Sequence, residues 1–308
     1  MSYDILNDFK DCVLCPRNCH ANRVSGPLGY CQSDYQYNIV AINKHLGEEP
    51  VISGEKGICN VFFSHCNMQC IYCQNHQISH NKNYITKKNL SLQEVVSRIN
   101  TILDEGINML GFVSPSHCVY QMKAIISALQ EKRDKPIIVY NTNSYDTVET
   151  LKTLEGIVDI YLPDFKYANA HLAHELSDAP NYPVIALKAI KEMVRQKGIK
   201  LRLDETGQAI SGVIIRHLVL PAYLNNSLEV IRLIAEEISP DIHISLMSQY
   251  FPTKTIESHP ILGRSIYKDE YETVINKMEE LGLFNGWLQD YESQRNYRPN
   301  FDNNDPFC

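Results

Sequence analysis

The chain has 308 residues, 44% of them hydrophobic and 21% charged, so it can bury a large core and is neither a disordered nor a fibrous protein. The net charge of -7 disfavours general electrostatic binding of nucleic acid. No apolar run approaches the about 20 residues that cross a bilayer, and the polar start Met1-Ser2-Tyr3-Asp4 lacks the layout of a signal peptide. We therefore expect a cytoplasmic protein with no membrane or nucleic-acid partner.

The first segment of the chain, residues 1–50, is rich in cysteine. Cys12, Cys15, Cys19 and Cys31 are spaced C-x2-C-x3-C-x11-C among Pro and Gly residues. Eight of the ten cysteines precede position 74, and such clustering in a reducing compartment indicates metal binding rather than disulfides. Four thiolates complete either a zinc site or a second [4Fe–4S] cluster, and the spacing does not separate the two. We predict a metal-binding knuckle here.

Residues 51–284 alternate short β-rich runs with helical stretches, which predicts repeated βα units around a parallel sheet. Helix starts are predicted where an N-cap acceptor precedes a Glu by three residues, at Ser91, Asp146 and Asn226. Six units fit an open partial barrel or a doubly wound sheet, and in both the site follows the carboxyl ends of the strands. Residues 285–308 are expected to form an extended tail without chemistry. The six predicted strands are 59–63, 108–113, 136–140, 157–162, 212–218 and 242–246.

Three further cysteines, Cys66, Cys70 and Cys73, directly follow the first of these strands with the spacing C-x3-C-x2-C. Structural zinc and an ordinary [4Fe–4S] cluster each have four protein ligands, so a compact set of three leaves one position vacant. The alternative is a four-ligand site that Cys59 or His65 completes.

This motif, with Tyr72 before its last cysteine, resembles that of the radical S-adenosylmethionine (radical SAM) superfamily. The resemblance implies an open partial (β/α)6 barrel in which Cys66, Cys70 and Cys73 hold a [4Fe–4S] cluster. It implies that S-adenosyl-L-methionine chelates the open iron and that Tyr72 lies against the adenine. An electron from a flavodoxin or ferredoxin would then release a 5′-deoxyadenosyl radical, which abstracts hydrogen from the substrate.

Polar residues follow the next two strands as well. Ser114 and Ser116 stand where the superfamily often carries a Gly-Gly-Glu segment, and they are candidates for contacting the cofactor's amine. Asn143, after the third strand, is a candidate for the ribose or carboxylate, with a turn or N-cap role as the alternative. The missing Glu departs from the family pattern.

The later strands carry charged residues. Asp164 and Lys166 share one side of an extended chain and match an Asp-x-Lys motif of glycyl-radical activating enzymes, in which the Lys lies near the cofactor carboxylate. A surface ion pair is the alternative. Arg216 resembles the Arg of a strand in the same enzymes, and Gln249 and Tyr250 are expected near the pocket.

Five segments in order, up to about Phe251, resemble the pyruvate formate-lyase activating enzyme-like group: CPRNC, FFSHCNMQCIYCQN, YLPDFKY, RHLVLP and MSQYFP. This resemblance implies that the substrate is a glycyl radical enzyme. No cysteine lies between Cys73 and Cys118, where many glycyl-radical activators carry further clusters, so the chain departs from that subgroup. Two alternatives stay open. One is radical modification of a small molecule, peptide or RNA, and the other is a non-catalytic iron–sulfur or zinc scaffold.

Overall fold

Parallel strands buried on both faces form the centre of the fold in the computed structural model. It describes residues 5–82, 88–131, 133–295, 298–303 and 305–307. Cys308 lies outside these ranges, and so do residues 1–4, on which the expected absence of a signal peptide depends. Among the described residues the sheet has ten strands, in the order β10-β9-β8-β6-β5-β4-β2-β1-β3 with β7 paired to β8. The strands are β1 Tyr37–His45, β2 Ile58–Phe63, β3 Lys88–Leu90, β4 Met109–Val113, β5 Ile137–Thr142, β6 Ile160–Pro163, β7 Arg202–Leu203, β8 Ala209–Leu218, β9 His243–Met247 and β10 Gly286–Leu288.

The sheet is open and mostly parallel. β2, β4, β5, β6, β8, β9 and β10 run parallel to one another, whereas β1 and β3 add antiparallel at one edge and β7 pairs antiparallel with β8. β10 and β3 are the two edges in the described part of the chain, so the sheet does not close. The predicted fold class is confirmed, and the six predicted strands correspond to β2, β4, β5, β6, β8 and β9.

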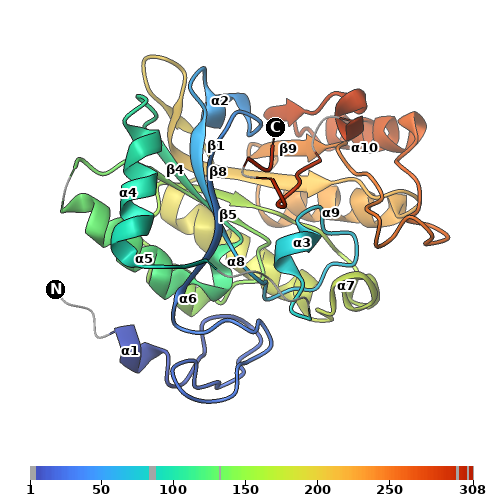
Figure 1. The fold of residues 1–308 in the computed structure, drawn as a ribbon. Coiled ribbons are helices and arrows are strands. Elements are labelled where there is room, and N and C mark those ends of the chain that lie inside the picture. Colours follow the sequence, from blue (N-terminus) through green and yellow to red (C-terminus); the bar gives the residue numbers. More distant parts are fainter. Residues whose placement is uncertain (1–4, 83–87, 132, 296–297, 304, 308) are drawn as a thin grey trace.

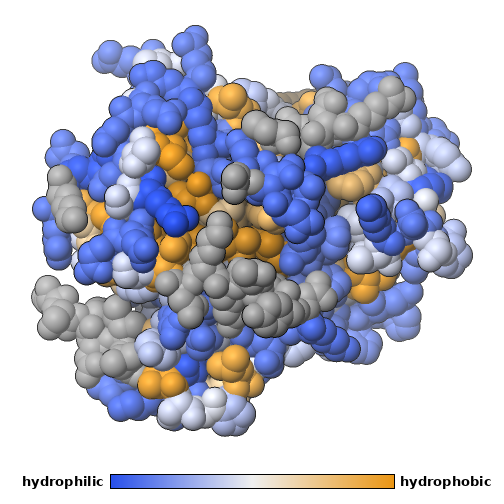
Figure 2. Space-filling model, in the orientation of Figure 1, coloured by the Kyte–Doolittle hydropathy of each residue, from blue (hydrophilic) through white to orange (hydrophobic). Residues whose placement is uncertain are grey.

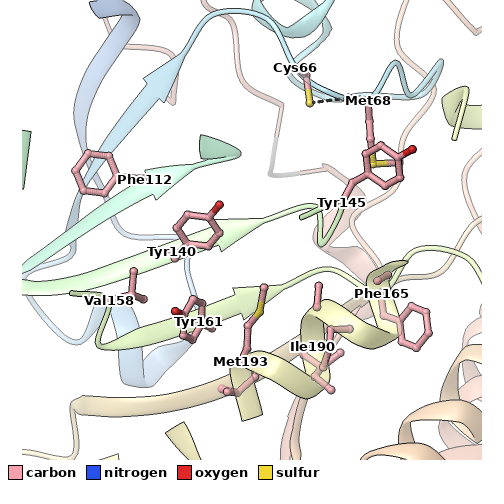
Figure 3. Packing of buried hydrophobic residues seen from close by; sticks show 14 of the residues in the cluster. Cys66, Met68, Phe112, Tyr140, Tyr145, Val158, Tyr161, Phe165, Ile190 and Met193 are labelled. Carbon is pink, nitrogen blue, oxygen red and sulfur yellow. Dashed lines mark hydrogen bonds between the residues drawn. The ribbon is translucent and has the colours of Figure 1, made fainter. Parts of the chain in front are cut away.

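Helices line the outer face of this curved sheet, as a partial barrel requires (Figure 1). The side chains of each strand alternate between two cores. The larger core contains Tyr140, Tyr161 and Met193 of α8, which Figure 3 shows packed together, and the smaller inner core contains Val139 and Ile160. The helices are α1 Ile5–Asp8, α2 Pro50–Ser53, α3 His76–Ser79, α4 Leu92–Leu103, α5 Val119–Gln130, α6 Val148–Lys152, α7 Ala170–Ser177, α8 Tyr182–Lys197, α9 Leu224–Glu237 and α10 Lys268–Glu280, with 3-10 helices η1 Pro115–His117 and η2 Tyr291–Arg295.

One of the three predicted helix starts is confirmed. Ser91 caps α4 in a reciprocal capping box with Glu94. The prediction at Asp146 is wrong, because this buried carboxylate accepts hydrogen bonds from Tyr140 and Thr142 while the next residue caps α6. The prediction at Asn226 is also wrong.

Asn226 lies inside the first turn of α9, which begins at Leu224. Its side-chain oxygen accepts a 2.9 Å hydrogen bond from the backbone N–H of Ala168, and its amide donates one of 2.9 Å to the carbonyl of Lys166. The side chain therefore fixes the loop after β6 rather than the end of its own helix.

The C-terminal segment returns to the sheet. Gly286–Leu288 form β10 and pair with β9, which the sequence did not predict. The ring of Phe301 lies 5.4 Å from that of Phe62 on β2, and the ring of Phe307 lies 4.4 Å from that of His45 on β1. On the face of the molecule that Figure 2 shows, hydrophobic side chains lie near the centre and hydrophilic ones surround them. None of the helices in the described ranges has the length and apolar character that crossing a bilayer requires.

Candidate functional site

The three-cysteine loop connects β2 to α3 at the carboxyl end of the first parallel strand, where the sequence predicts it. Cys66 is buried, and Cys70 and Cys73 are partly buried. The sulfur of Cys66 accepts hydrogen bonds of 3.4 Å from the backbone N–H of Met68, drawn in Figure 3, and from the side-chain amide of Asn143. Asn143 thus joins the end of β5 to this loop.

Each of the other two sulfurs also accepts a hydrogen bond. Ser177, the last residue of α7, donates a 2.9 Å bond from its hydroxyl to Cys70, and Ser79 of α3 donates a 3.3 Å bond to Cys73. Behind Ser177, the hydroxyl of Tyr167 lies 2.6 Å from the serine oxygen and 2.6 Å from the hydroxyl of Tyr72. The predicted adenine contact Tyr72 is therefore buried and linked to Cys70 through two hydroxyls.

Burial controls the protonation of these thiols. It raises the pKa of Cys66 to about 12 and that of Cys70 to about 11; neighbouring thiols also raise the pKa of each, whereas the charge of Lys166 lowers it. A metal that coordinates a thiol replaces its proton, and the hydrogen bonds on the sulfurs then stabilise the thiolate charge. The donors around the sulfurs fit a metal-bound thiolate set.

The arrangement fits a cluster better than a single ion. Within the described ranges, no three His, Cys, Asp or Glu side chains converge closely enough to hold one metal ion, and this applies to the N-terminal cysteines as well. A [4Fe–4S] cluster does not need such convergence, because each cysteine binds a different iron. Cys59 does not complete a fourth position: its thiol is buried within β2, and the charge that acts on it is that of Glu105.

Asp164 and Lys166 lie on one side of the chain after β6, as predicted. The ammonium of Lys166 is 2.5 Å from Asp164 Oδ2, and both side chains are less than a fifth exposed, so this is not a surface ion pair. The hydroxyl of Tyr182 donates to the carbonyls of Asn143 and Asp164 and accepts from the backbone N–H of Lys166. It thereby ties together the ends of β5 and β6.

Arg216 lies on β8 and pairs with two carboxylates that the sequence analysis missed. Its Nη1 is 3.1 Å from Glu48 Oε2, and its Nε is 3.4 Å from Glu49 Oε1. Asn60 of β2 donates a 2.9 Å bond to the other oxygen of Glu48. The sequence signal was a polar Asn inside an otherwise apolar strand, which needs a buried partner.

The remaining predicted residues occupy the same end of the sheet. Ser114, after β4, has a left-handed φ of 49° that turns the chain into η1. Ser116 is buried, and its hydroxyl lies 3.1 Å from that of Thr142 at the end of β5. The carbonyl of Gln249 accepts a 2.8 Å bond from Gln74, just after the three-cysteine loop.

Tyr250 lies beside this loop as well. Its ring meets that of Tyr72 edge to face at 6.2 Å, and its hydroxyl donates to the carbonyl of Leu262. Polar residues after β5, β6 and β9 therefore lie beside the three-cysteine loop.

The four N-terminal cysteines form a group of their own. Cys12, Cys15 and Cys31 are buried and Cys19 is exposed. Burial raises the pKa of Cys15 to about 12, and the other three thiols raise it further through their charges, which places all four near one another. A Cβ at Gly29 would lie 2.4 Å from the sulfur of Cys19, so the backbone passes closely over this thiol.

Arg23 is a residue of this group that the sequence analysis missed. Its side chain is buried, and its Nη1 lies 3.9 Å from the sulfur of Cys12. The thiols of Cys31, Cys118 and Cys12 raise the pKa of Arg23 against the effect of burial, which acts to lower it. Cys118, isolated in the sequence, therefore lies beside the N-terminal cysteines in the fold.

Comparisons with known proteins agree with this geometry. The profile of the family described as the radical SAM superfamily matches residues 60–201, which include the three-cysteine loop, Asn143, Asp164 and Lys166. The uncharacterized protein MJ0674 of Methanocaldococcus jannaschii is 28% identical over 284 residues, which cover 90% of this chain and 77% of that protein.

Two solved structures share the fold. HydG, a maturase of the [FeFe]-hydrogenase, matches with a TM-score of 0.50 and 16% identity over 74% of this chain and 50% of HydG. SuiB of Streptococcus suis, bound to S-adenosylmethionine, matches with a TM-score of 0.50 and 11% identity over 76% of this chain and 52% of SuiB. The chain spans about half the length of these structures, and at such identities the likeness concerns the fold alone.

Proposed function

From the match of residues 60–201 to the radical SAM superfamily, we propose that this chain is an enzyme in which Cys66, Cys70 and Cys73 hold a [4Fe–4S] cluster beside S-adenosyl-L-methionine. The observation that carries the proposal is the set of three sulfurs at the end of the first parallel strand, each with its own hydrogen-bond donor. When bound, the cluster and the cofactor supply a 5′-deoxyadenosyl radical that abstracts hydrogen from a substrate.

The side chains around the loop have separate roles in this proposal. Lys166, held by Asp164, offers its ammonium to the carboxylate of the cofactor, because a compact cation suits an anion. Asn143 orients the Cys66 sulfur and borders the ribose or carboxylate, and Ser114 and Ser116 contact the cofactor's amine. Tyr72, fixed through Tyr167, borders the adenine.

The N-terminal cysteines Cys12, Cys15, Cys19 and Cys31 hold a second metal in this proposal, either zinc or a further iron–sulfur cluster. The support is a complete set of four thiols around Cys15 together with Arg23, a buried cation that lies among thiols. A buried cation beside neutral thiols lacks a counter-charge, whereas thiolates on a metal provide one.

For the substrate we propose a glycyl radical enzyme, with a flavodoxin or ferredoxin as electron donor and the cytoplasm as the location. The support is the Asp-x-Lys motif, which forms a shielded ion pair at the strand end, and Arg216, whose side chain lies within the sheet's concave side.

The test is anaerobic reconstitution with iron and sulfide, followed by chemical reduction in the presence of S-adenosyl-L-methionine and chromatography for 5′-deoxyadenosine. Wild-type protein is expected to form the product, and Cys66→Ala, Cys70→Ala and Cys73→Ala are expected to lose it. Cys59→Ala, a buried thiol outside the site, is the matched control and keeps it. A fully loaded wild-type protein that forms no product would overturn the proposal.

Metal analysis of the same preparations tests the N-terminal site. Cys15→Ala is expected to lose either zinc or iron relative to wild type, while it retains the signal of the cluster on Cys66, Cys70 and Cys73. The lost element identifies the second metal. Equal metal content in both proteins would show that these four thiols hold none.

A further inference from the structure

A polar group interrupts the inner core of the partial barrel. Asn60 and Arg216 lie two residues beyond Ile58 and Ile214, which belong to that core, so all four residues share the inner face of the sheet. Glu48 enters from the loop after β1 and bonds both polar residues. The group therefore lies on the concave side of the sheet, beyond the inner core.

The strand next to β2 leaves space for this group. Gly111 of β4 pairs directly with Asn60, and a Cβ at Gly111 would lie only 2.1 Å from Asn60 Oδ1. A side chain at this position would displace the Asn60 amide that binds Glu48. The glycine therefore keeps the polar group intact.

Among the residues that the structure describes, the carboxylates of this group are not balanced by an equal number of cations. Glu48 and Glu49 are two carboxylates, with side chains 7% and 4% exposed, and Arg216 is the cation that both contact. His45 faces Glu48 as well, but burial lowers its pKa, so its ring adds no charge at neutral pH. The neighbouring pair of Asp164 and Lys166 is neutral as a whole. One negative charge remains.

That charge has an open hydrogen-bonding position. Glu49 Oε2 is buried and has no hydrogen-bond partner among the described residues. The Nε of Arg216 lies 3.4 Å from the other oxygen of Glu49 and makes an ion pair but no hydrogen bond with it. A buried carboxylate oxygen without a donor is costly, so this oxygen needs a donor from an ordered water or from a bound ligand.

The open position lies close to the proposed chemistry. The backbones of Arg216 and Asp164 form a β-bridge between adjacent strands, and the carboxylate of Asp164 pairs with Lys166. The hydroxyl of Tyr182 joins the carbonyl of Asp164 to that of Asn143, whose amide donates to Cys66. A substrate bound at Glu49 therefore lies on the inner side of the sheet, next to the residues that hold the cofactor.

We propose that Glu49, positioned by Arg216, binds a positively charged nitrogen of the substrate, an ammonium or guanidinium group. This inference rests on the proposed function. It deepens that proposal, because it names the chemical class of substrate that the radical site accepts. Either a small amine or a basic side chain of a protein substrate carries such a group.

Calorimetry on the full reconstituted protein tests the proposal without radical chemistry. The protein is kept oxidised and saturated with S-adenosyl-L-methionine, and n-butylammonium, methylguanidinium and neutral n-butanol are titrated as probes. The cations are expected to bind about tenfold more tightly than butanol and to lose about tenfold in Glu49→Gln. Glu105→Gln, at a surface ion pair with Lys44, is the matched control and changes nothing.

Two outcomes would overturn the proposal. In one, Glu49→Gln binds the cations as wild type does. In the other, Glu49→Gln weakens S-adenosyl-L-methionine itself by the same factor, which would assign Glu49 to the cofactor's amine. Neither outcome depends on whether 5′-deoxyadenosine is formed, so the proposed function is tested separately.

Thermal unfolding provides a second readout. Because its charge is not compensated, Glu49→Gln is expected to keep or raise the melting temperature, whereas Glu48→Gln, which breaks bonds to Arg216 and Asn60, lowers it. An equal decrease in both variants would mean a purely structural pair and would overturn the proposal.

A further titration, with peptides, distinguishes the two possible sources of the cation, a protein substrate and a small amine. A short glycine-containing peptide with one Arg is compared with the same peptide carrying Gln at that position. A preference for the Arg peptide over free methylguanidinium supports a protein substrate, and binding of the small cations alone supports a small amine.

Discussion

The guanidinium of Arg23 donates a 2.7 Å hydrogen bond from Nη1 to the carbonyl oxygen of His117. The same guanidinium donates to the carbonyls of Ser33 and Asp34, at 2.8 and 2.9 Å. These bonds join the N-terminal cysteine segment to η1 after β4, next to the predicted cofactor residue Ser116. The knuckle is therefore fastened to the end of the sheet that carries the site.

Replacing Arg23 with Met is expected to destabilise the protein by about 3 kcal/mol, because two buried carbonyls and one partly buried carbonyl lose a charged donor. Urea unfolding at neutral pH measures the change in the free energy of unfolding. Arg98→Met, at an exposed position on α4, is the control and should stay within about 0.5 kcal/mol of wild type. An equal effect at both positions would contradict the structural role of Arg23.

Removing the hydroxyl of Ser177 is expected to lower the reduction potential of the proposed cluster. Hydrogen bonds to cysteine sulfur stabilise the more negative reduced state, and Ser177→Ala removes the 2.9 Å bond to Cys70. A redox titration followed by electron paramagnetic resonance measures the midpoint, with iron content as the check on loading. Ser97→Ala, exposed on α4, is the control and should leave the midpoint unchanged. An equal shift of the midpoint in both variants would contradict the role of the hydrogen bond from Ser177 to Cys70.

Gly111 and Asn60 are expected to show strong energetic coupling. Gly111→Ala alone should cost about 1–3 kcal/mol of stability, because its methyl group overlaps the Asn60 amide. In an Asn60→Ala background the same substitution should cost less, since the space is then open. A double-mutant cycle by denaturant unfolding measures the difference, and purely additive effects would contradict this packing.

The stability of the helix α10 is expected to depend on acid. Burial opposes ionisation of Glu270, but hydrogen bonds from Arg264 and from the backbone of Tyr267 and Ala222 lower its pKa to about 2 from an ordinary value of 4.5. Because the folded-state pKa is depressed, this contribution to the stability is complete above about pH 4.5 and is lost as the pH falls towards about 2.

Urea midpoints of wild type and Glu270→Gln, compared from pH 6 down to pH 2, test this linkage. At pH 6 the free energy of unfolding of wild type should exceed that of Glu270→Gln by a few kcal/mol. This difference should shrink as the pH falls from about 4.5 towards about 2. A gap that does not change with pH would exclude the carboxylate as its source.

The sequence predicted the core of the sheet because its strands are apolar runs with strong turn signals. β2 and β4 are buried along nearly their whole length, so their composition alone marks them. β1 was missed because it runs antiparallel near an edge and is only partly buried, and β10 because it has three residues. Short or half-exposed strands depend on their partners rather than on their own pattern.

The residues of the site divide in the same way, into those that a local pattern predicts and those that only the fold brings together. The spacing of Cys66, Cys70 and Cys73 predicted the loop, since those residues bind through local geometry. Glu48, one of the two partners of Arg216, lies 168 residues away from it in the loop after β1, and no local pattern connects this loop to β8. Asp146 is the opposite case. Its spacing indicated a helix start, but in the fold its carboxylate accepts a hydrogen bond from Tyr140 instead of capping the helix.

The order in which the site is made has a consequence for biosynthesis. Asn143, which donates to Cys66, follows it by 77 residues, and Ser177, which donates to Cys70, follows it by 107. At translation rates of roughly 5–20 residues per second, the cysteine loop leaves the ribosome roughly 5–20 s before Ser177 does. During that interval its thiols are open to oxidants and to metal-delivery proteins alike, so the redox state of the compartment acts on this protein before it has folded.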